Sequence, residues 1–209
     1  MKKTTLLAVL LALPLCGCAQ EPETPKGTEP VNPPKALVVW FSATGTTKGV
    51  AERLAGAIGA DLYEIVPETP YSMADLDWRD KQSRSSVEMA DRASRPAIAG
   101  IVPDLSGVEV VFIGFPTWWY REPSIIDTFV EANADALAGK TLVPFATSGG
   151  SGMGDSSANL QALAPAAKVA EGRRFRGSAS ADELAAWAQS IRWSKRPLPW
   201  RSEECLPVP

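Results

Sequence analysis

The sequence predicts a three-layer α/β sandwich, in which a doubly wound, five-stranded parallel sheet lies between two layers of helices. Short apolar runs alternate with amphipathic stretches from residue 36 onward, and this alternation is typical of parallel strands joined by helical crossovers. Several of the apolar runs are uninterrupted, as expected for strands that are covered on both faces. Hydrophobic residues make up 45% of the 209-residue chain, which is enough for one domain with a sizeable core.

Five segments carry the strand signal. Residues 36–41 (ALVVWF) and 109–115 (EVVFIGF) are nearly continuous apolar runs, so we place them at the centre of the sheet. Residues 62–66 alternate between apolar and polar side chains and are expected nearer an edge. Residues 141–146 form the fourth predicted strand, and residues 168–175 contain a weaker signal for the fifth.

Helical periodicity lies between these strands. Residues 46–58 carry apolar side chains at helical spacing, and Gly59 is expected to end this helix. Further helices are predicted at residues 123–137, 157–163 and 181–193. Residues 67–105 are the hardest part of the sequence to interpret, although a polar stretch around residues 76–93 could be helical.

The N-terminus predicts export. Two lysines precede an apolar run at residues 6–15 that is too short to span a bilayer, as in a secretory signal peptide. Residues 15–18 (LCGC) resemble the lipobox of bacterial lipoproteins, which implies that residues 1–17 are removed and that the Cys18 sulfur is diacylated. The alternative is a secreted protein that is cleaved near Ala19 and has no lipid anchor; the lipobox-like spacing favours the lipoprotein.

The segments on either side of the predicted domain lack strand or helix periodicity. Residues 18–34 are rich in proline and are predicted to form an extended tether. Residues 194–209 are predicted to form an extended tail. The globular domain is therefore expected at residues 35–193, held by its lipid anchor on the extracytoplasmic side of a bacterial membrane.

The composition excludes several kinds of chemistry. The chain contains no histidine, which removes Ser-His and Cys-His nucleophilic sites and most zinc sites. Its three cysteines, Cys16, Cys18 and Cys205, have no spacing typical of a metal site or a disulfide framework. The formal net charge is −3 and there is no basic run, so no nucleic-acid partner is predicted. Any reaction must therefore use carboxylates, hydroxyls, aromatic rings or a bound cofactor.

Three loops follow predicted buried strands, at the edge of the sheet where ligands bind in this architecture. The first, residues 42–47 (SATGTT), supplies hydroxyl groups and leads into a helix whose positive end favours a phosphate. This loop has no lysine or arginine and does not match GxxxxGK[ST], so it suits a terminal monophosphate better than a nucleoside triphosphate with magnesium. Taken alone, the same residues could simply cap the helix.

The second and third loops favour a planar cofactor. Residues 116–120 (PTWWY) place three consecutive aromatic residues after a buried strand, and stacking on a flat ring would bury those that the core cannot accommodate. An aromatic cluster that merely covers the sheet edge is the alternative for one of the two tryptophans. Residues 147–154 (TSGGSGMG) contain glycines that let the backbone approach a ligand closely, and a flexible connection is the alternative.

Together, the three loops resemble the cofactor loops of the flavodoxin-like family, in particular its branch with F-S-x-T-G-x-T and P-x-W-W motifs. The resemblance covers residues 36–192 and implies a flavodoxin-like fold that binds FMN. It implies that the first loop binds the ribityl phosphate, the second covers the isoalloxazine ring and the third contacts the ring edge. The residues carried over are Ser42, Thr44, Gly45, Thr46 and Thr47 for the phosphate, Pro116, Thr117, Trp118, Trp119 and Tyr120 for the ring, and Ser148, Gly149 and Gly150 for its edge.

The resemblance leaves the reaction open, because flavin chemistry needs no catalytic side chain. One interpretation is a membrane-tethered electron carrier that meets a redox partner protein across an acidic rim. The candidates for this rim are Asp75, Asp77, Glu122 and Asp155. The other interpretation is an FMN-dependent NAD(P)H:quinone-type oxidoreductase acting on a small quinone-like acceptor, although the chain has no GxGxxG dinucleotide fingerprint. A lipoprotein whose flavin site no longer functions is the non-redox alternative.

Two features differ from the electron-carrier flavodoxins. Their second loop usually contains a small residue, whereas residues 117–120 are bulky here. Arg121 follows the aromatic residues and, if it points toward the flavin, would favour a negatively charged, two-electron-reduced ring. Both features lead to the hypothesis that two-electron chemistry is at least as well supported as one-electron shuttling.

Overall fold

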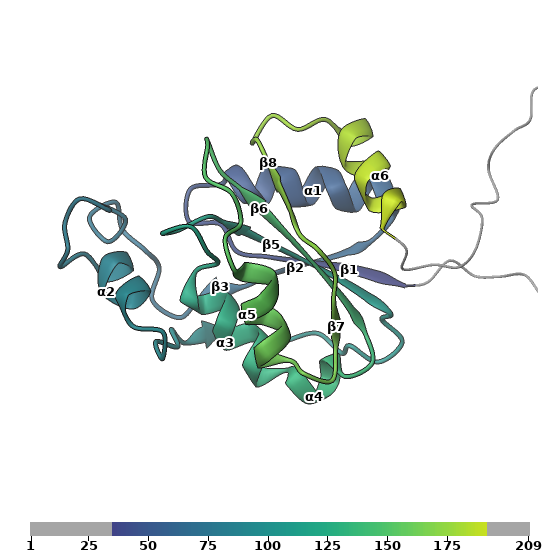
Figure 1. The fold of residues 1–209 in the computed structure, drawn as a ribbon, viewed down its shortest axis with the longest axis horizontal. Coiled ribbons are helices and arrows are strands. Elements are labelled where there is room, and N and C mark those ends of the chain that lie inside the picture. The colour runs from purple at the N-terminus through teal and green to yellow at the C-terminus, as the bar shows by residue number, and fades with distance from the viewer. Residues whose placement is uncertain (1–34, 192–209) are drawn as a thin grey trace, which may run out of the picture. The chain divides into compact units, whose positions relative to one another are not determined.

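The computed structural model describes residues 35–191 of the chain (Figure 1). The predicted signal peptide, the tether with Cys18 and the C-terminal tail lie outside the described residues. Within residues 35–191, none of the helices combines the length and the apolar character that are needed to cross a lipid bilayer.

A parallel sheet forms the centre of the domain. Its strands follow the order β2-β1-β5-β6, and β7 and β8 both pair with the far side of β6. The bounds are β1 Ala36–Trp40, β2 Asp61–Glu64, β5 Val110–Pro116, β6 Thr141–Thr147, β7 Lys168–Val169 and β8 Arg173–Phe175. Every pairing in this sheet is parallel. The predicted α/β fold with five strand positions is therefore confirmed, including the edge position of residues 61–64.

The fifth strand position is interrupted, and Pro144 of β6 explains why. Leu142 accepts a hydrogen bond from the Ala170 N–H at 2.8 Å, so this edge of β6 faces the fifth strand. Pro144 points to the same edge two residues later and has no N–H to donate. The ladder therefore stops after β7 and resumes at β8, where Arg173 pairs with Phe145.

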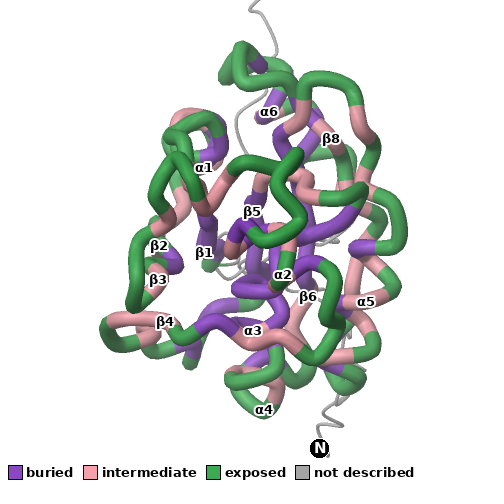
Figure 2. Tube along the Cα trace, turned by 90° about the vertical axis from the view of Figure 1, so that its left-hand side faces the viewer, coloured by how far each residue is buried: buried purple, intermediate pink, exposed green. Residues whose placement is uncertain are grey.

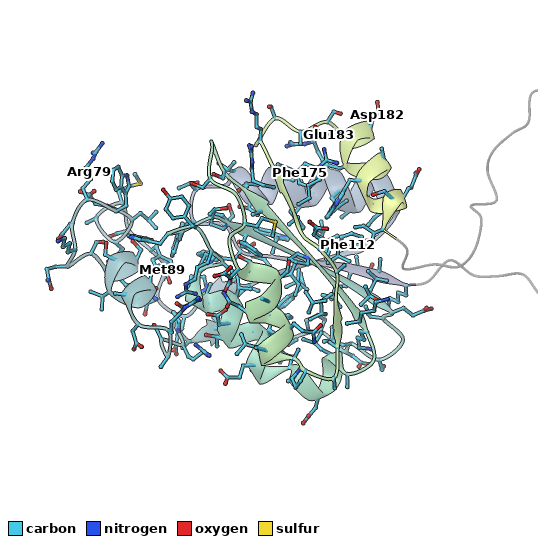
Figure 3. All side chains as sticks on the ribbon, in the orientation of Figure 1. Arg79, Met89, Phe112, Phe175, Asp182 and Glu183 are labelled. Atoms are coloured by element: carbon cyan, nitrogen blue, oxygen red, sulfur yellow. The ribbon has the colours of Figure 1, made fainter. Side chains whose placement is uncertain are left out.

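Helices cover both faces of the sheet (Figure 1). Helices α1 (Thr46–Ile58) and α6 (Ala181–Ser190) pack on one face, where the core includes Trp40, Phe112, Phe145, Phe175 and Trp187. Helices α3 (Ser124–Ala132), α4 (Ala134–Leu137) and α5 (Ser156–Leu163) lie on the other face, where the core includes Phe41, Ile113, Phe115, Ile126 and Phe129. The central strands β1, β5 and β6 are buried between the two layers (Figure 2), and Phe112 and Phe175 point to the α1 and α6 side (Figure 3).

The helix boundaries follow local chemistry. Gly59 ends α1 in the left-handed conformation, with φ at 67° and its N–H bonded to the Ala55 carbonyl, as predicted. The single helix expected at residues 123–137 is instead two helices, α3 and α4. The chain leaves helical geometry at Asn133, whose side-chain amide donates to the Phe129 carbonyl at 2.7 Å.

Residues 65–109 connect β2 to β5 and form a long segment, which is called the insertion below. The sequence pattern does not assign helices and strands to most of this segment. Strands β3 (Val66–Pro67) and β4 (Ile98–Ala99) pair antiparallel as a separate ribbon, and α2 (Arg84–Ala90) is much shorter than the predicted residues 76–93. Residues 72–82 form turns because aspartate side chains accept hydrogen bonds from nearby backbone N–H groups, as Asp77 does from Arg79 at 3.0 Å. This part of the insertion projects from the sheet, with Arg79 at its far end (Figure 3).

Candidate functional site

The three predicted loops meet at the carboxyl edge of the sheet. They follow β1, β5 and β6, which are neighbours in parallel register, so their ends lie side by side. Two cavities open between them, with volumes of about 470 Å³ and 440 Å³. Thr44 and Pro116 line both cavities, so the two spaces adjoin.

The first cavity is aromatic and has no charged residue in its lining. Its walls are made by Ala43, Thr44, Leu76, Trp78, Ser85, Pro116, Thr117, Trp118, Trp119, Tyr120 and Ser151. A cavity of this size and composition suits a flat, largely apolar ring with a few polar edge atoms.

The aromatic residues of the second loop take different positions. Trp118 is half-buried and packs edge-on against Phe41 and Tyr71, with ring centroids 5.7 and 5.3 Å apart. Trp119 and Tyr120 are 44% and 72% exposed. Trp118 therefore packs against the core, while the rings of Trp119 and Tyr120 remain available to contact a ligand in the cavity.

A tight turn presents these two rings. The backbone groups of Trp118 and Arg121 exchange hydrogen bonds at 2.9 and 3.0 Å, and the two residues between them have positive φ, 44° at Trp119 and 65° at Tyr120. This is the pattern of a type I′ turn, which usually takes Asn and Gly. Left-handed backbone at two bulky residues costs about 1–3 kcal/mol each, and such strain is typical of functional sites. Gly154 of the third loop packs directly on the turn, because a Cβ there would collide with the Tyr120 carbonyl.

The second cavity is polar and lies at the start of α1. It is lined by Thr44, Thr46, Pro116, Thr147, Ser148, Gly149, Arg176 and Gly177. Gly45 occupies the N-cap position, and no side chain caps the helix. The first N–H groups of α1 therefore retain hydrogen-bonding capacity for an anion.

The predicted site residues fall into three groups. Those at the first cavity are Thr44, Pro116, Thr117, Trp118, Trp119 and Tyr120. Those at the second are Thr44, Thr46, Pro116, Ser148 and Gly149. Ser42, Gly45, Thr47 and Gly150 line neither cavity. The Thr47 hydroxyl is buried and hydrogen-bonded to the Thr147 hydroxyl at 2.8 Å. This bond joins the first loop to the third loop, so Thr47 stabilises the site without lining a cavity.

The structure adds residues that the sequence interpretation missed. Leu76, Trp78 and Ser85 form an outer wall of the first cavity and come from the insertion. Arg176 and Gly177 reach the second cavity directly after β8. Arg176 could have been found from the sequence, because it directly follows the fifth predicted strand and ligands bind at the carboxyl ends of the strands. Leu76, Trp78 and Ser85 follow no predicted strand, so no such signal marks them.

The insertion is fastened to the second loop through Tyr71. The Tyr71 ring contacts Trp118, and its hydroxyl donates to Glu88 of α2 at 2.5 Å. Burial and the Glu88 carboxylate raise the pKa of Tyr71, so the hydroxyl stays protonated. Arg84 donates to the same carboxylate at 2.7 Å and lies 4.1 Å from the Tyr71 ring centroid. These contacts fix α2 beside the aromatic cavity.

Ser85 has an unusual environment in this wall. The residue is 1% exposed, and its hydroxyl has no hydrogen-bond partner among the described residues. A buried hydroxyl without a partner is unfavourable. Because Ser85 lines the first cavity, a ligand with an acceptor atom could satisfy it.

The condition stated for Arg121 is not met, and Glu122 is wrong as a candidate for the acidic rim. Arg121 lines neither cavity; its side chain is buried and donates to Asp127 at 3.2 Å and to the Glu122 carbonyl at 3.1 Å. Glu122 is completely buried and cannot belong to an acidic rim. Both residues directly follow the tight turn and are held by buried partners, since Arg121 binds Asp127 and the Glu122 N–H donates to the Ser156 hydroxyl at 3.1 Å. Asp77 and Asp155 are exposed, whereas Asp75 accepts hydrogen bonds from Ser72.

Comparisons with known proteins agree with the fold. The sequence model of the family described as Flavodoxin matches residues 35–191. A crystal structure from Bacteroides eggerthii, of a protein provisionally classed as a flavoprotein, is 49% identical, covers 74% of this chain and 96% of its own, and gives a TM-score of 0.69. A similarly classed protein from Bacteroides uniformis is 43% identical over 74% of this chain and 97% of its own, with a TM-score of 0.68.

A more distant structure carries a ligand. The flavoprotein from Lactobacillus acidophilus was solved in complex with FMN; it is 21% identical, covers 75% of this chain and 99% of its own, and gives a TM-score of 0.58. At this identity the likeness concerns the fold. No sequence among curated proteins matches the chain.

Proposed function

The chain belongs to the flavodoxin family, and from this premise we propose that it is an FMN-binding redox protein, an electron carrier tethered to a membrane. One observation supports the cofactor above all others: an uncharged aromatic cavity adjoins a polar cavity at a helix start, and Thr44 and Pro116 are common to both. FMN has the same two chemically different ends, a flat ring system and a phosphate.

The residues present fit FMN in this orientation. Trp119 and Tyr120 would stack on or flank the ring, since they are exposed at the aromatic cavity. Thr46, Ser148 and the first N–H groups of α1 would hold the phosphate. When bound, FMN accepts and releases electrons, and the protein sets its potential and access.

Access at the turn supports transfer to a protein partner. Tyr120 is 72% exposed, so one rim of the aromatic cavity reaches the surface. Asp77 and Asp155 are exposed acidic residues that a basic redox partner could recognise. Lipidation at Cys18 would keep this surface beside a membrane on a proline-rich tether.

Flavin titration tests the cofactor. The full-length protein, purified from membranes in detergent, is expected to bind FMN, with quenching of flavin fluorescence and an altered visible spectrum. An anaerobic reductive titration then gives the number of electrons taken up in each step. Protein that fails to bind FMN would contradict the proposal and favour the non-redox alternative.

Radiolabelled fatty acid tests the tether. The wild-type chain is expected to incorporate label when it is expressed in a bacterium, and Cys18→Ser is expected to lose it. Cys16→Ser is the matched control, because it removes the neighbouring thiol and should keep the label. Equal labelling of the two variants would contradict lipidation at Cys18.

A second candidate function is an FMN-dependent quinone-type reductase, which the insertion favours. Leu76, Trp78 and Ser85 give the aromatic cavity an additional wall, and the Ser85 hydroxyl lacks a partner. A quinone could stack on the aromatic side chains and accept a hydrogen bond from Ser85. Steady oxidation of NADH or NADPH in the presence of a quinone would support this function; a carrier without its partners would show none.

A further inference from the structure

We propose that Arg176 provides the positive charge that recognises the phosphate of the cofactor, so that the site selects FMN over riboflavin. The inference rests on the proposed function, because it concerns how that flavin is recognised. Arg176 follows β8 and therefore lies at the same edge of the sheet as the three flavin loops. It lines the polar cavity together with Thr44, Thr46 and Ser148.

The backbone around Arg176 is held against α1. Arg53 of α1 donates to the Ala179 carbonyl at 2.9 Å and to the Gly177 carbonyl at 2.5 Å. The Ala179 N–H closes the turn on the Arg176 carbonyl at 3.0 Å. These bonds fasten residues 176–179 to α1, and the cavity that Arg176 and Gly177 share with Thr44 and Thr46 lies at the start of this helix, where a phosphate would meet the free N–H groups.

Close packing at Gly177 supports the same placement. A Cβ at this position would lie 2.7 Å from the Thr46 Cγ2 atom, which is closer than real Cβ contacts allow. Gly177 thus lets the loop touch Thr46, and Arg176 is brought to the hydroxyl-lined side of the cavity. Any larger residue would push the loop away from α1.

Charge considerations make Arg176 the suitable partner for a phosphate. The first loop contains no lysine or arginine, and neither cavity is lined by an acidic residue. Within residues 35–191, no carboxylate lies within ion-pairing distance of Arg176. By contrast, Arg173 pairs with Glu183 at 3.1 Å, and Arg53 donates hydrogen bonds to the carbonyls of Gly177 and Ala179. Arg176 is thus the cationic side chain in the cavity lining, and its charge is not already neutralised.

The expected effect is moderate because Arg176 is exposed to water. A charge-assisted hydrogen bond to an anion is stronger than a neutral one, but solvent and salt screen it at a surface. Loss of the guanidinium should therefore weaken FMN binding about tenfold at low ionic strength. Riboflavin lacks the phosphate, so its affinity should not change.

The test compares FMN and riboflavin binding to the full-length protein by fluorescence titration at low and high ionic strength. Arg176→Ala should weaken FMN binding about tenfold at low salt, abolish most of its salt dependence and leave riboflavin binding unchanged. Arg176→Lys should restore part of the difference. Arg173→Ala is the matched control, because it removes a nearby arginine, on β8, that pairs with Glu183 and lies outside the cavity lining.

The outcomes separate the two proposals. Wild-type protein that binds neither flavin would overturn the proposed function and this inference with it. Wild-type protein that binds both flavins equally, or an Arg176→Ala variant that keeps full FMN affinity or loses FMN and riboflavin affinity in parallel, would overturn the inference alone. Inorganic phosphate, added to wild-type protein with riboflavin, distinguishes a general phosphate site from one that requires the phosphate joined to the flavin.

Discussion

Arg121 donates a hydrogen bond to Asp127 at 3.2 Å, and both side chains are almost completely buried. The same guanidinium lies 3.6 Å from the carboxylate of Glu122, so it serves two buried acids. One oxygen of each acid, Oε2 of Glu122 and Oδ1 of Asp127, has no hydrogen-bond partner among the described residues. Burial, followed by the negative charge of Glu122, raises the pKa of Asp127 to about 7. A proton retained by Asp127 would relieve the repulsion between the two acids.

This raised pKa predicts the pH dependence of stability. Asp127 keeps its proton up to about pH 7 in the folded protein, whereas the ordinary value is 3.8. Its contribution to stability is therefore complete below the ordinary value and is lost as the pH rises toward 7. Over this range the free energy of unfolding of wild type should fall relative to Asp127→Asn, by at most about 1.4 kcal/mol per pH unit. Chemical denaturation at a series of pH values measures the difference.

Asp104 provides the control of opposite sign. Its carboxylate is exposed and accepts hydrogen bonds from the Ser106 hydroxyl and backbone N–H, which lower the pKa of Asp104. The contribution of Asp104 to stability is present above its ordinary pKa and is lost as the pH falls. The free energy of unfolding of wild type should therefore rise with pH relative to that of Asp104→Asn, which is the opposite of the trend expected for Asp127→Asn. Parallel profiles for wild type and Asp127→Asn would contradict the assignment of a raised pKa to Asp127.

Close packing across the sheet predicts a strong effect at Gly114. A Cβ at this position would overlap the Phe145 ring and lie 2.7 Å from its Cε2 atom. Gly114 is buried in the central strand β5, so Gly114→Ala should lower the free energy of unfolding by about 1–3 kcal/mol through overpacking. Combining it with Phe145→Leu should cost less than the sum of the two single changes. Additive costs would show that the ring is not the cause.

Gly56 is the matched control for this change. It lies in the last turn of α1, and apart from its chain neighbours and the helix's own backbone no atom of the described residues lies within 4 Å of the position that a Cβ would occupy. Gly56→Ala should therefore raise the free energy of unfolding by about 0.5–1 kcal/mol. Equal losses at both glycines would contradict the packing argument.

The strand pattern and the loops that follow it could be predicted because each depends on local sequence. Buried parallel strands are apolar without interruption, and their carboxyl ends must meet at one edge, so residues 42–47, 116–120 and 147–154 could be brought together from the sequence alone. The interruption of the fifth strand could not. It depends on which edge of β6 lacks a donor at Pro144, and this requires the register.

Other parts of the site depend on contacts that leave no periodic signal. Residues 72–82 are held by aspartate turns, and α2 is held by Tyr71, Glu88 and Arg84, so the wall at Ser85 was missed. The direction of Arg121 depends on left-handed backbone at Trp119 and Tyr120, which are residues that seldom adopt it. The sequence shows that Arg121 follows the second loop, but it does not show which way the side chain points, and in the structure Arg121 lines neither cavity.

The hydroxyl pair behind the first loop gives a further prediction. Thr47 and Thr147 are buried and joined by a hydrogen bond of 2.8 Å. Thr47→Val would leave the Thr147 hydroxyl without its partner, and the free energy of unfolding should fall by about 1–3 kcal/mol. The double variant Thr47→Val with Thr147→Val removes both polar groups and should recover most of this loss. The single variant Thr147→Val is measured as well. If the double variant loses as much stability as the two single variants together, the two residues contribute through other contacts and not through their shared hydrogen bond.

The two tryptophans of the second loop should separate stability from cofactor binding. Trp118 packs against Phe41 and Tyr71, so Trp118→Ala should lower the free energy of unfolding by about 2 kcal/mol. Trp119 is 44% exposed at the aromatic cavity, so Trp119→Ala should change stability by no more than about 0.5 kcal/mol. Loss of its stacking should instead raise the dissociation constant of FMN by roughly twofold to tenfold. Denaturation and FMN titration of both variants provide the check. A Trp119→Ala variant with unchanged FMN affinity and reduced stability would reverse the two roles, and the turn would then serve the fold and not the cofactor.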